Sequence, residues 1–218
     1  MEKNRSGNYT SLRFTKQPRG PTSKPAGSFG VSARRAFLKA ALLAGLGLPL
    51  VDEALGDESP AATEHPREGD VFVFGEGEHK GSEIKPGDLP LGGPQVLAWP
   101  KDPKSGVVRD GSRLNQVLLL RLDPASLDDE TRAHAADGTV AYSAICTHEQ
   151  CPVDGWVEDQ GRQVLKCPCH DSEYDPRANA KVIFGPAPRQ LPALPVRIDD
   201  GALVAAGTFL SKVGFRPG

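Results

Sequence analysis

The feature that most constrains the fold of this chain is a group of four cysteines lying close together. The 218 residues contain four cysteines and five histidines. All four cysteines lie between residues 146 and 169, with two histidines among them, in the segments CTHEQC (146–151) and CPCH (167–170). Such a group forms disulfides, a metal site or both, and each of these fixes two loops against one another.

Three kinds of site can be built from these six side chains. A scaffold made only of disulfides has three alternative connectivities and gives the two histidines no role. A zinc site could take any four of the six groups, although the usual zinc spacing, C-x2-4-C, differs from a cysteine closely followed by a histidine. In the third, one cysteine and one histidine of each segment bind a metal centre and the remaining cysteines form a disulfide.

The two segments resemble the paired boxes of the Rieske iron–sulfur proteins, C-T-H-x-G-C and C-P-C-H-x-S. The resemblance implies one [2Fe–2S] cluster held by four ligands, two from each segment: Cys146, His148, Cys167 and His170. In this class the two cysteines bind one iron and the two histidines bind the other. The resemblance also implies a disulfide between Cys151 and Cys169.

Residues after the second box match further features of that family. Ser172 and Tyr174 stand where the family places two residues that donate hydrogen bonds to cluster sulfurs, which favours a high reduction potential. The segment 185–188 matches the proline-rich loop that covers the cluster, and its residues are Gly185, Pro186, Ala187 and Pro188. Glycine and proline hold a backbone rigidly close to a group without needing a side chain.

The resemblance runs from about Thr139 to Gly207, a third of the chain, and three positions depart from it. Gln150 replaces the glycine before the last cysteine of the first box, and Asp171 stands where glycine often follows the second histidine. Glu149 occupies a position that is typically leucine in quinol–cytochrome c reductase subunits, where it is part of an apolar docking tip. A carboxylate is costly to bury against an apolar surface, which weakens assignment to a standard cytochrome bc complex.

The N-terminal segment has a different composition from the rest of the chain. Residues 1–39 carry nine lysines and arginines against one acid, whereas the remainder carries seventeen basic and twenty-seven acidic residues. Arg34 and Arg35, followed by Phe-Leu-Lys and the apolar run 40–51, resemble a twin-arginine export signal. Twelve apolar residues are too few for a bilayer core of about 30 Å, so a stable membrane anchor is disfavoured. Whether the signal is cleaved stays open, and so do the two outcomes, a soluble protein or one anchored by an uncleaved signal.

The expected compartment agrees with the expected chemistry. A disulfide needs an oxidising compartment, and twin-arginine transport, as that resemblance implies, carries cargo that has already folded around its cluster. We therefore expect a leader over residues 1–56 and a Rieske domain over 57–218, with the cluster-binding subdomain at about 140–190.

The exported part is predicted to be all-β, with antiparallel sheets. Glycine and proline make up about a fifth of the chain, and turn signals separate short β-prone runs at 71–74, 96–99, 117–122, 139–145, 163–166, 181–184, 195–198 and 202–206. One short helix is expected in an insertion, with Asp123 as its cap, Pro124 in its first turn and residues 126–136 in its body. The other three histidines, His65, His79 and His134, are expected to face solvent.

These features together predict a periplasmic, high-potential Rieske electron-transfer protein. It would be a subunit of a cytochrome bc-like quinol oxidoreductase or the small subunit of another oxidoreductase, as in arsenite oxidase, and would not be catalytic alone. The expected partners are a redox subunit or cytochrome, quinol reached through a membrane subunit, and the twin-arginine export machinery. The alternative is a redox-inactive binding module stapled by zinc or disulfides. The ferredoxin component of a Rieske oxygenase is disfavoured because those proteins lack the extra cysteine pair, and the acidic folded part does not favour nucleic acid.

Overall fold

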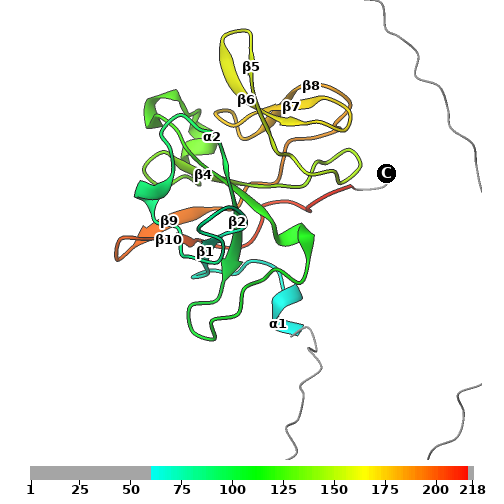
Figure 1. The fold of residues 1–218 in the computed structure, drawn as a ribbon. Coiled ribbons are helices and arrows are strands. Elements are labelled where there is room, and N and C mark those ends of the chain that lie inside the picture. The colour runs from blue at the N-terminus through cyan, green and yellow to red at the C-terminus, as the bar shows by residue number, and fades with distance from the viewer. Residues whose placement is uncertain (1–59, 216–218) are drawn as a thin grey trace, which may run out of the picture. The chain divides into compact units, whose positions relative to one another are not determined.

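The larger of two β-sheets contains six antiparallel strands, in the spatial order β4-β3-β2-β1-β10-β9 (Figure 1). The structure, a computed structural model, describes residues 60–215. The strands of this base sheet are β1 (Val71–Phe74), β2 (Val96–Lys101), β3 (Val117–Arg121), β4 (Thr139–Ser143), β9 (Val196–Asp199) and β10 (Ala202–Ala205). The leader, with Arg34 and Arg35, lies outside the described residues.

The smaller sheet is an insertion between β4 and β9. Its strands follow one another in the order β5-β6-β7-β8, all antiparallel. They are β5 (Gly155–Asp159), β6 (Arg162–Cys167), β7 (Ser172–Asp175) and β8 (Lys181–Phe184). After β8 the chain returns to the base sheet, where Tyr142 of β4 pairs with Ala193 and the Leu194 amide donates to the Ala141 carbonyl. The inserted sheet is thereby held at both ends by β4.

Strand β3 is buried on both faces, which explains its uninterrupted apolar sequence. Successive side chains of a strand point to opposite faces, so Val117 and Leu119 join the core cluster of the base sheet. Leu118 and Leu120 face the other way and pack in a second cluster that includes Leu165 of the small sheet. The second cluster is therefore the core that joins the two sheets.

Helices are short throughout the described part of the chain. They are α1 (Pro60–Thr63), η1 (Pro86–Asp88), η2 (Arg113–Asn115), η3 (Pro124–Ser126) and α2 (Asp129–Arg132). Within residues 60–215 no helix has the length and apolar character needed to span a bilayer.

The all-β prediction is confirmed, but the predicted insertion helix is wrong in its extent. Asp123 caps only the short η3, accepting a hydrogen bond from the Ala125 amide. Asp128 then caps a separate turn, α2, by accepting from the Thr131 amide. Asp128 lies inside the expected helix body. Because a cap residue takes a non-helical conformation, it interrupts the helix and begins a new one. The prediction also missed β5 and β7.

The prediction that His134 faces solvent is wrong as well. His134 is 7% exposed and its ring lies edge-on to the ring of Tyr142, with centroids 6.5 Å apart. Burial lowers the pKa of His134, so this imidazole is neutral at physiological pH. His65 and His79 are exposed, as expected.

A buried ion pair fixes the start of the described chain to the base sheet. Arg109 and Asp70 have side chains only 3% exposed, and two guanidinium nitrogens donate to the two carboxylate oxygens at 2.6 and 3.0 Å. The same guanidinium donates to Glu64 at 3.1 Å and to the Ala61 carbonyl at 3.3 Å. Residues 61–70 are thereby attached to the segment that carries Arg109.

We predict that Arg109→Ala destabilises the protein by about 3–5 kcal/mol, because Asp70 would be left buried and charged without its partner. Urea unfolding of the full-length protein measures the loss. Arg197→Ala is the matched control: Arg197 forms exposed ion pairs with Glu68 and Asp199, worth at most about 1 kcal/mol. An Arg109→Ala loss no larger than that of the control would contradict the prediction.

Candidate metal centre

The two cysteine-containing segments form neighbouring loops at one edge of the small sheet. Loop 1 (residues 144–154) joins β4 to β5. Loop 2 (residues 167–172) is the tight connection between β6 and β7, counted with the last residue of β6 and the first of β7. In loop 1 the Cys146 amide donates to the Cys151 carbonyl at 2.8 Å, and the Gln150 amide donates to the Cys146 carbonyl at 3.1 Å. In loop 2 Cys167 is paired directly with Ser172 across the hairpin. Both loops are therefore anchored by main-chain hydrogen bonds at their bases.

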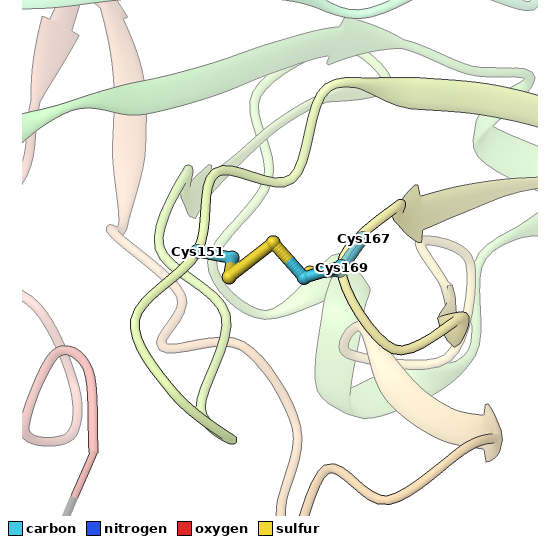
Figure 2. A group of neighbouring side chains, drawn as sticks. All are labelled: Cys151, Cys167 and Cys169. Atoms are coloured by element: carbon cyan, nitrogen blue, oxygen red, sulfur yellow. A yellow bond between two sulfur atoms is a disulfide. The ribbon is translucent and has the colours of Figure 1, made fainter.

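A disulfide joins the two loops. Cys151 of loop 1 is bonded to Cys169 of loop 2, with their Cα atoms 6.5 Å apart (Figure 2). The Cys167 sulfur lies within 4.8 Å of both disulfide sulfurs. The bond thereby holds loop 1 against loop 2 beside the Cys167 sulfur.

The other two cysteines are free and buried. Cys146 and Cys167 are each 1% exposed and contact one another. Burial, together with the neighbouring Cys146 sulfur, raises the pKa of the Cys167 thiol to about 11. The thiol is therefore protonated at neutral pH without a metal, and binding a metal ion would release its proton.

The rings of the two histidines in the boxes lie against each other. Each histidine follows one of the free cysteines closely in the sequence. The rings of His148 and His170 are nearly perpendicular, with centroids 4.7 Å apart. His148 Nδ1 is buried and, among the described residues, has no hydrogen-bond partner. A buried polar atom without a partner is costly, and coordination to a metal is one way to satisfy it. The side chain of His170 is 46% exposed, so the outer edge of the pair reaches solvent.

A buried tyrosine lies next to one of the free thiols. Tyr174 is fully buried in β7, and its hydroxyl oxygen lies 3.2 Å from the Cys146 sulfur. Burial raises the pKa of Tyr174 above its usual value, so the hydroxyl keeps its proton and can donate a hydrogen bond to the Cys146 sulfur when that sulfur is deprotonated.

The segment 185–188 lies over the β6–β7 hairpin. The Ala187 amide donates to the hydroxyl of the buried Ser172 at 3.2 Å. Gly185 has φ +87°, and a Cβ there would lie 2.5 Å from the Ser172 Cα. Only glycine permits this approach of two backbones. The geometry holds the covering segment directly against loop 2; a hydrogen bond from Ser172 to a cluster sulfur stays a prediction.

Of the three residues that depart from the family pattern, two have a left-handed backbone conformation and the third is exposed. Gln150 and Asp171 have φ values of +58° and +57°, in the left-handed region where glycine has no steric penalty. Glu149 is exposed, and one of its carboxylate oxygens lies 3.8 Å from His170 Nε2. A negative charge therefore stands at the exposed edge of the histidine pair.

One functional contact was missed by reasoning from sequence. The hydroxyl of Thr147, between Cys146 and His148, donates to the Arg189 carbonyl at 2.6 Å and so connects loop 1 to the residue that follows the covering segment. The threonine in the first box was a signal for a fixed role, but its partner lies 42 residues away and no local pattern points to it.

Residues 103–195 match the family model of the Rieske [2Fe–2S] domain. This range includes both loops, the disulfide and the covering segment. The domain binds a [2Fe–2S] cluster, and the side chains assembled here fit such a group: two buried thiols, a histidine nitrogen without a partner and a second histidine beside it.

The chain is also similar to curated proteins named cytochrome bc1 complex Rieske iron–sulfur subunit. It is 43% identical to the Streptomyces lividans protein over 100 residues, which is 45% of this chain and 58% of the relative. Identity to the Corynebacterium diphtheriae protein is 51% over 107 residues, covering 46% of this chain and 26% of the relative. For Mycobacterium tuberculosis it is 34% over 148 residues, covering 61% and 34%. The matched region thus spans between about a quarter and three fifths of these relatives.

Solved structures of Rieske proteins show limited similarity to the whole chain. The soluble domain of Rieske protein II (soxF) from Sulfolobus acidocaldarius is 24% identical, with a TM-score of 0.35, over 44% of this chain and 65% of that one. The plasma membrane Rieske protein PetC3 from Synechocystis PCC 6803 is 22% identical, with a TM-score of 0.32, over 51% and 84%.

We predict that Tyr174→Phe lowers the reduction potential of the bound cluster. The hydroxyl donates to a sulfur that becomes more negative on reduction, so its loss destabilises the reduced state. One hydrogen bond of about 1 kcal/mol corresponds to roughly 40 mV for a one-electron couple. Redox titration of the full-length protein measures the shift.

Tyr142→Phe is the control for this prediction. Tyr142 is equally buried, but its hydroxyl donates to the Pro176 carbonyl at 2.8 Å. Equal potentials in the wild type and Tyr174→Phe, or the same shift in both variants, would refute the role of Tyr174.

Proposed function

We propose that this chain, whose residues 103–195 are a Rieske [2Fe–2S] domain, is the electron-transferring iron–sulfur subunit of a membrane-bound quinol oxidoreductase of the cytochrome bc1 type. The observation that carries the proposal is the pairing of two buried free thiols with two adjacent histidines on loops joined by a disulfide. The relatives named as bc1 Rieske subunits support the choice of complex.

The ligands in this proposal come in equal numbers from the two loops: Cys146 and His148 from loop 1, Cys167 and His170 from loop 2. When bound, the cluster supplies reversible one-electron chemistry. The chain excludes water from the cysteine side of the site, where Cys146 and Cys167 are each 1% exposed. It leaves the histidine side accessible to solvent, where the side chain of His170 is 46% exposed. A partner therefore exchanges electrons through the histidine edge.

The residues around the ligands have distinct roles in the proposal. The disulfide Cys151–Cys169 fixes the two ligand pairs relative to each other. The covering segment excludes water from the side of the site that carries the cysteines. Tyr174 and Ser172 favour the reduced state by donating hydrogen bonds, which places the potential in the upper part of the Rieske range of about −150 to +300 mV.

The exposed carboxylate of Glu149 favours a second candidate. It stands beside His170 at the edge where a partner would dock, and burying it against an apolar quinol pocket would be costly. The second candidate is therefore the small subunit of a different oxidoreductase, of the arsenite oxidase type, docking through a surface that accommodates this carboxylate.

Electron paramagnetic resonance tests the cluster and its ligands. We expect the reduced full-length protein to give the rhombic low-temperature signal of a [2Fe–2S] cluster with mixed histidine and cysteine ligation. His148→Ala is expected to abolish this signal, whereas His65→Ala, at an exposed histidine outside the loops, leaves it unchanged. A signal that survives His148→Ala would rule out His148 as a ligand.

Purification from detergent-solubilised membranes distinguishes the two candidate complexes. A cytochrome bc1-type complex would co-purify with b-type and c-type haem absorption, and quinol would reduce the cluster. Co-purification with a large oxidoreductase subunit, without b-type haem and without reduction by quinol, would support the second candidate and contradict the first.

We further propose that the domain functions on the periplasmic side, after export by the twin-arginine machinery. The disulfide supports this, because such bonds persist in oxidising compartments. Replacing Arg34 and Arg35 together by lysine is expected to leave the protein in the cytoplasm, as judged by cell fractionation. The control replaces Arg13 and Arg19 by lysine, keeps the charge of the leader and is expected to leave export unchanged. Normal export of the Arg34/Arg35 variant would overturn the assignment.

A further inference from the structure

Residues 207–215, which follow β10, run from the base sheet to loop 1. We call this segment the strap. Figure 1 shows it in red, leaving β10 in the direction of the yellow-green loop 1. Its first attachment is a main-chain hydrogen bond from the Leu210 amide to the Ala193 carbonyl, at 2.8 Å.

The strap packs on the base-sheet core through Phe209, and the side chains that follow, up to Val213, are exposed or only partly buried. A pocket of about 450 Å³ lies against it, lined by strap residues and by His65 and Leu114. Lys212 is exposed and Val213 is only partly buried. The far end of the strap therefore depends on polar contacts more than on apolar packing.

Arg189 supplies those contacts. Its guanidinium donates to the Lys212 carbonyl at 2.6 Å and to the Gly214 carbonyl at 2.5 Å. The carbonyl of the same residue accepts the hydrogen bond from Thr147, inside loop 1. One residue thus holds the strap with its side chain and loop 1 with its backbone.

The end of the strap also contacts loop 1 directly. Gly214 is buried, and a Cβ at this position would lie 3.0 Å from Gln150 Cγ and 3.1 Å from Gln150 Cδ. Gln150 has a left-handed φ of +58°, a conformation that a non-glycine residue keeps only when its surroundings hold it. Its carbonyl accepts from Arg113 at 2.7 Å. Gln150 is therefore contacted both by Arg113 and by the strap.

From this arrangement we propose that the strap is a clamp on loop 1 and that Arg189 is its positioning residue. By closing over Gln150, the strap keeps loop 1 in the conformation that presents Cys146 and His148. Its loss lets loop 1 open locally while both sheets stay folded. The inference deepens the proposed function and rests on it only where the ligand roles of Cys146 and His148 enter.

Hydrogen exchange of the full-length, cluster-loaded protein tests the clamp. In Arg189→Ala we expect the loop 1 amides of Cys146 and Gln150 to exchange roughly five- to thirtyfold faster, the factor for one or two lost hydrogen bonds. Amides of β3 and β4 should keep their wild-type rates. Arg197→Ala is the control. The Arg197 guanidinium also donates to a backbone carbonyl, that of Ala205, but this contact belongs to the β9–β10 strand pair and not to loop 1.

A pair of glycine variants tests the same clamp without removing Arg189. Gly214→Ala places a Cβ against Gln150 at a positive φ of +74°, whereas Gly207→Ala meets nothing within 4 Å and has no positive φ. We expect faster exchange of loop 1 only in Gly214→Ala. The rate at which an iron chelator removes the cluster should rise in Gly214→Ala and Arg189→Ala and stay unchanged in the two controls.

Two results would overturn the clamp: unchanged loop 1 exchange in both Arg189→Ala and Gly214→Ala, or equal acceleration in loop 1 and in the base sheet. The second would mean that these residues contribute only to global stability. Failure of the ligand assignment is distinguishable, since it appears in the paramagnetic resonance of His148→Ala and leaves loop exchange unaffected.

Discussion

The covalent bond between Cys151 and Cys169 is the constraint on which the site depends. Loop 1 and loop 2 belong to different strand connections, and neither contains a complete set of donor groups. The bond holds the loops together so that the Cys146 and Cys167 thiols contact one another and the rings of His148 and His170 lie 4.7 Å apart. Main-chain hydrogen bonds inside each loop then fix the individual side chains, and the covering segment closes the sulfur side through Ala187 and Ser172.

The electrostatics of the site are asymmetric, and the asymmetry follows the burial. On the inner side, Cys146, Cys167 and Tyr174 are excluded from water, so each hydrogen bond to sulfur acts in a medium of low polarity. On the outer side, His170 and Glu149 reach solvent, where charge is screened. In the proposed function, the inner residues determine the relative stability of the redox states, and the outer ones determine which partner surface is acceptable.

Much of the fold and of the site could be predicted from sequence, because the informative residues are close together in the chain. The apolar runs at Val71–Phe74 and Val117–Arg121 are strands, since their side chains fill the core on one or both faces. Strand β7 (Ser172–Asp175) was missed because its sequence is polar. It is nevertheless buried, as Glu173 pairs with Lys166 and Tyr174 contacts Cys146. The contact of Gly214 with Gln150 spans more than sixty residues, and no local periodicity encodes such a pairing.

The ion pair of Arg109 with Asp70 also determines how force would travel through the molecule. Residues 61–70 are attached to the segment between β2 and β3 by this guanidinium and by two further hydrogen bonds. The Asn115 side-chain amide donates to the Glu64 carbonyl, and the Gly111 main-chain amide donates to the Ala62 carbonyl. A pull on the chain from the N-terminal side would therefore reach the segment 109–116, which also contacts loop 1 through the Arg113 guanidinium and the Gln150 carbonyl. Residues 61–70 and loop 1 are thus mechanically connected through one short segment, the one that carries Arg109 and Arg113.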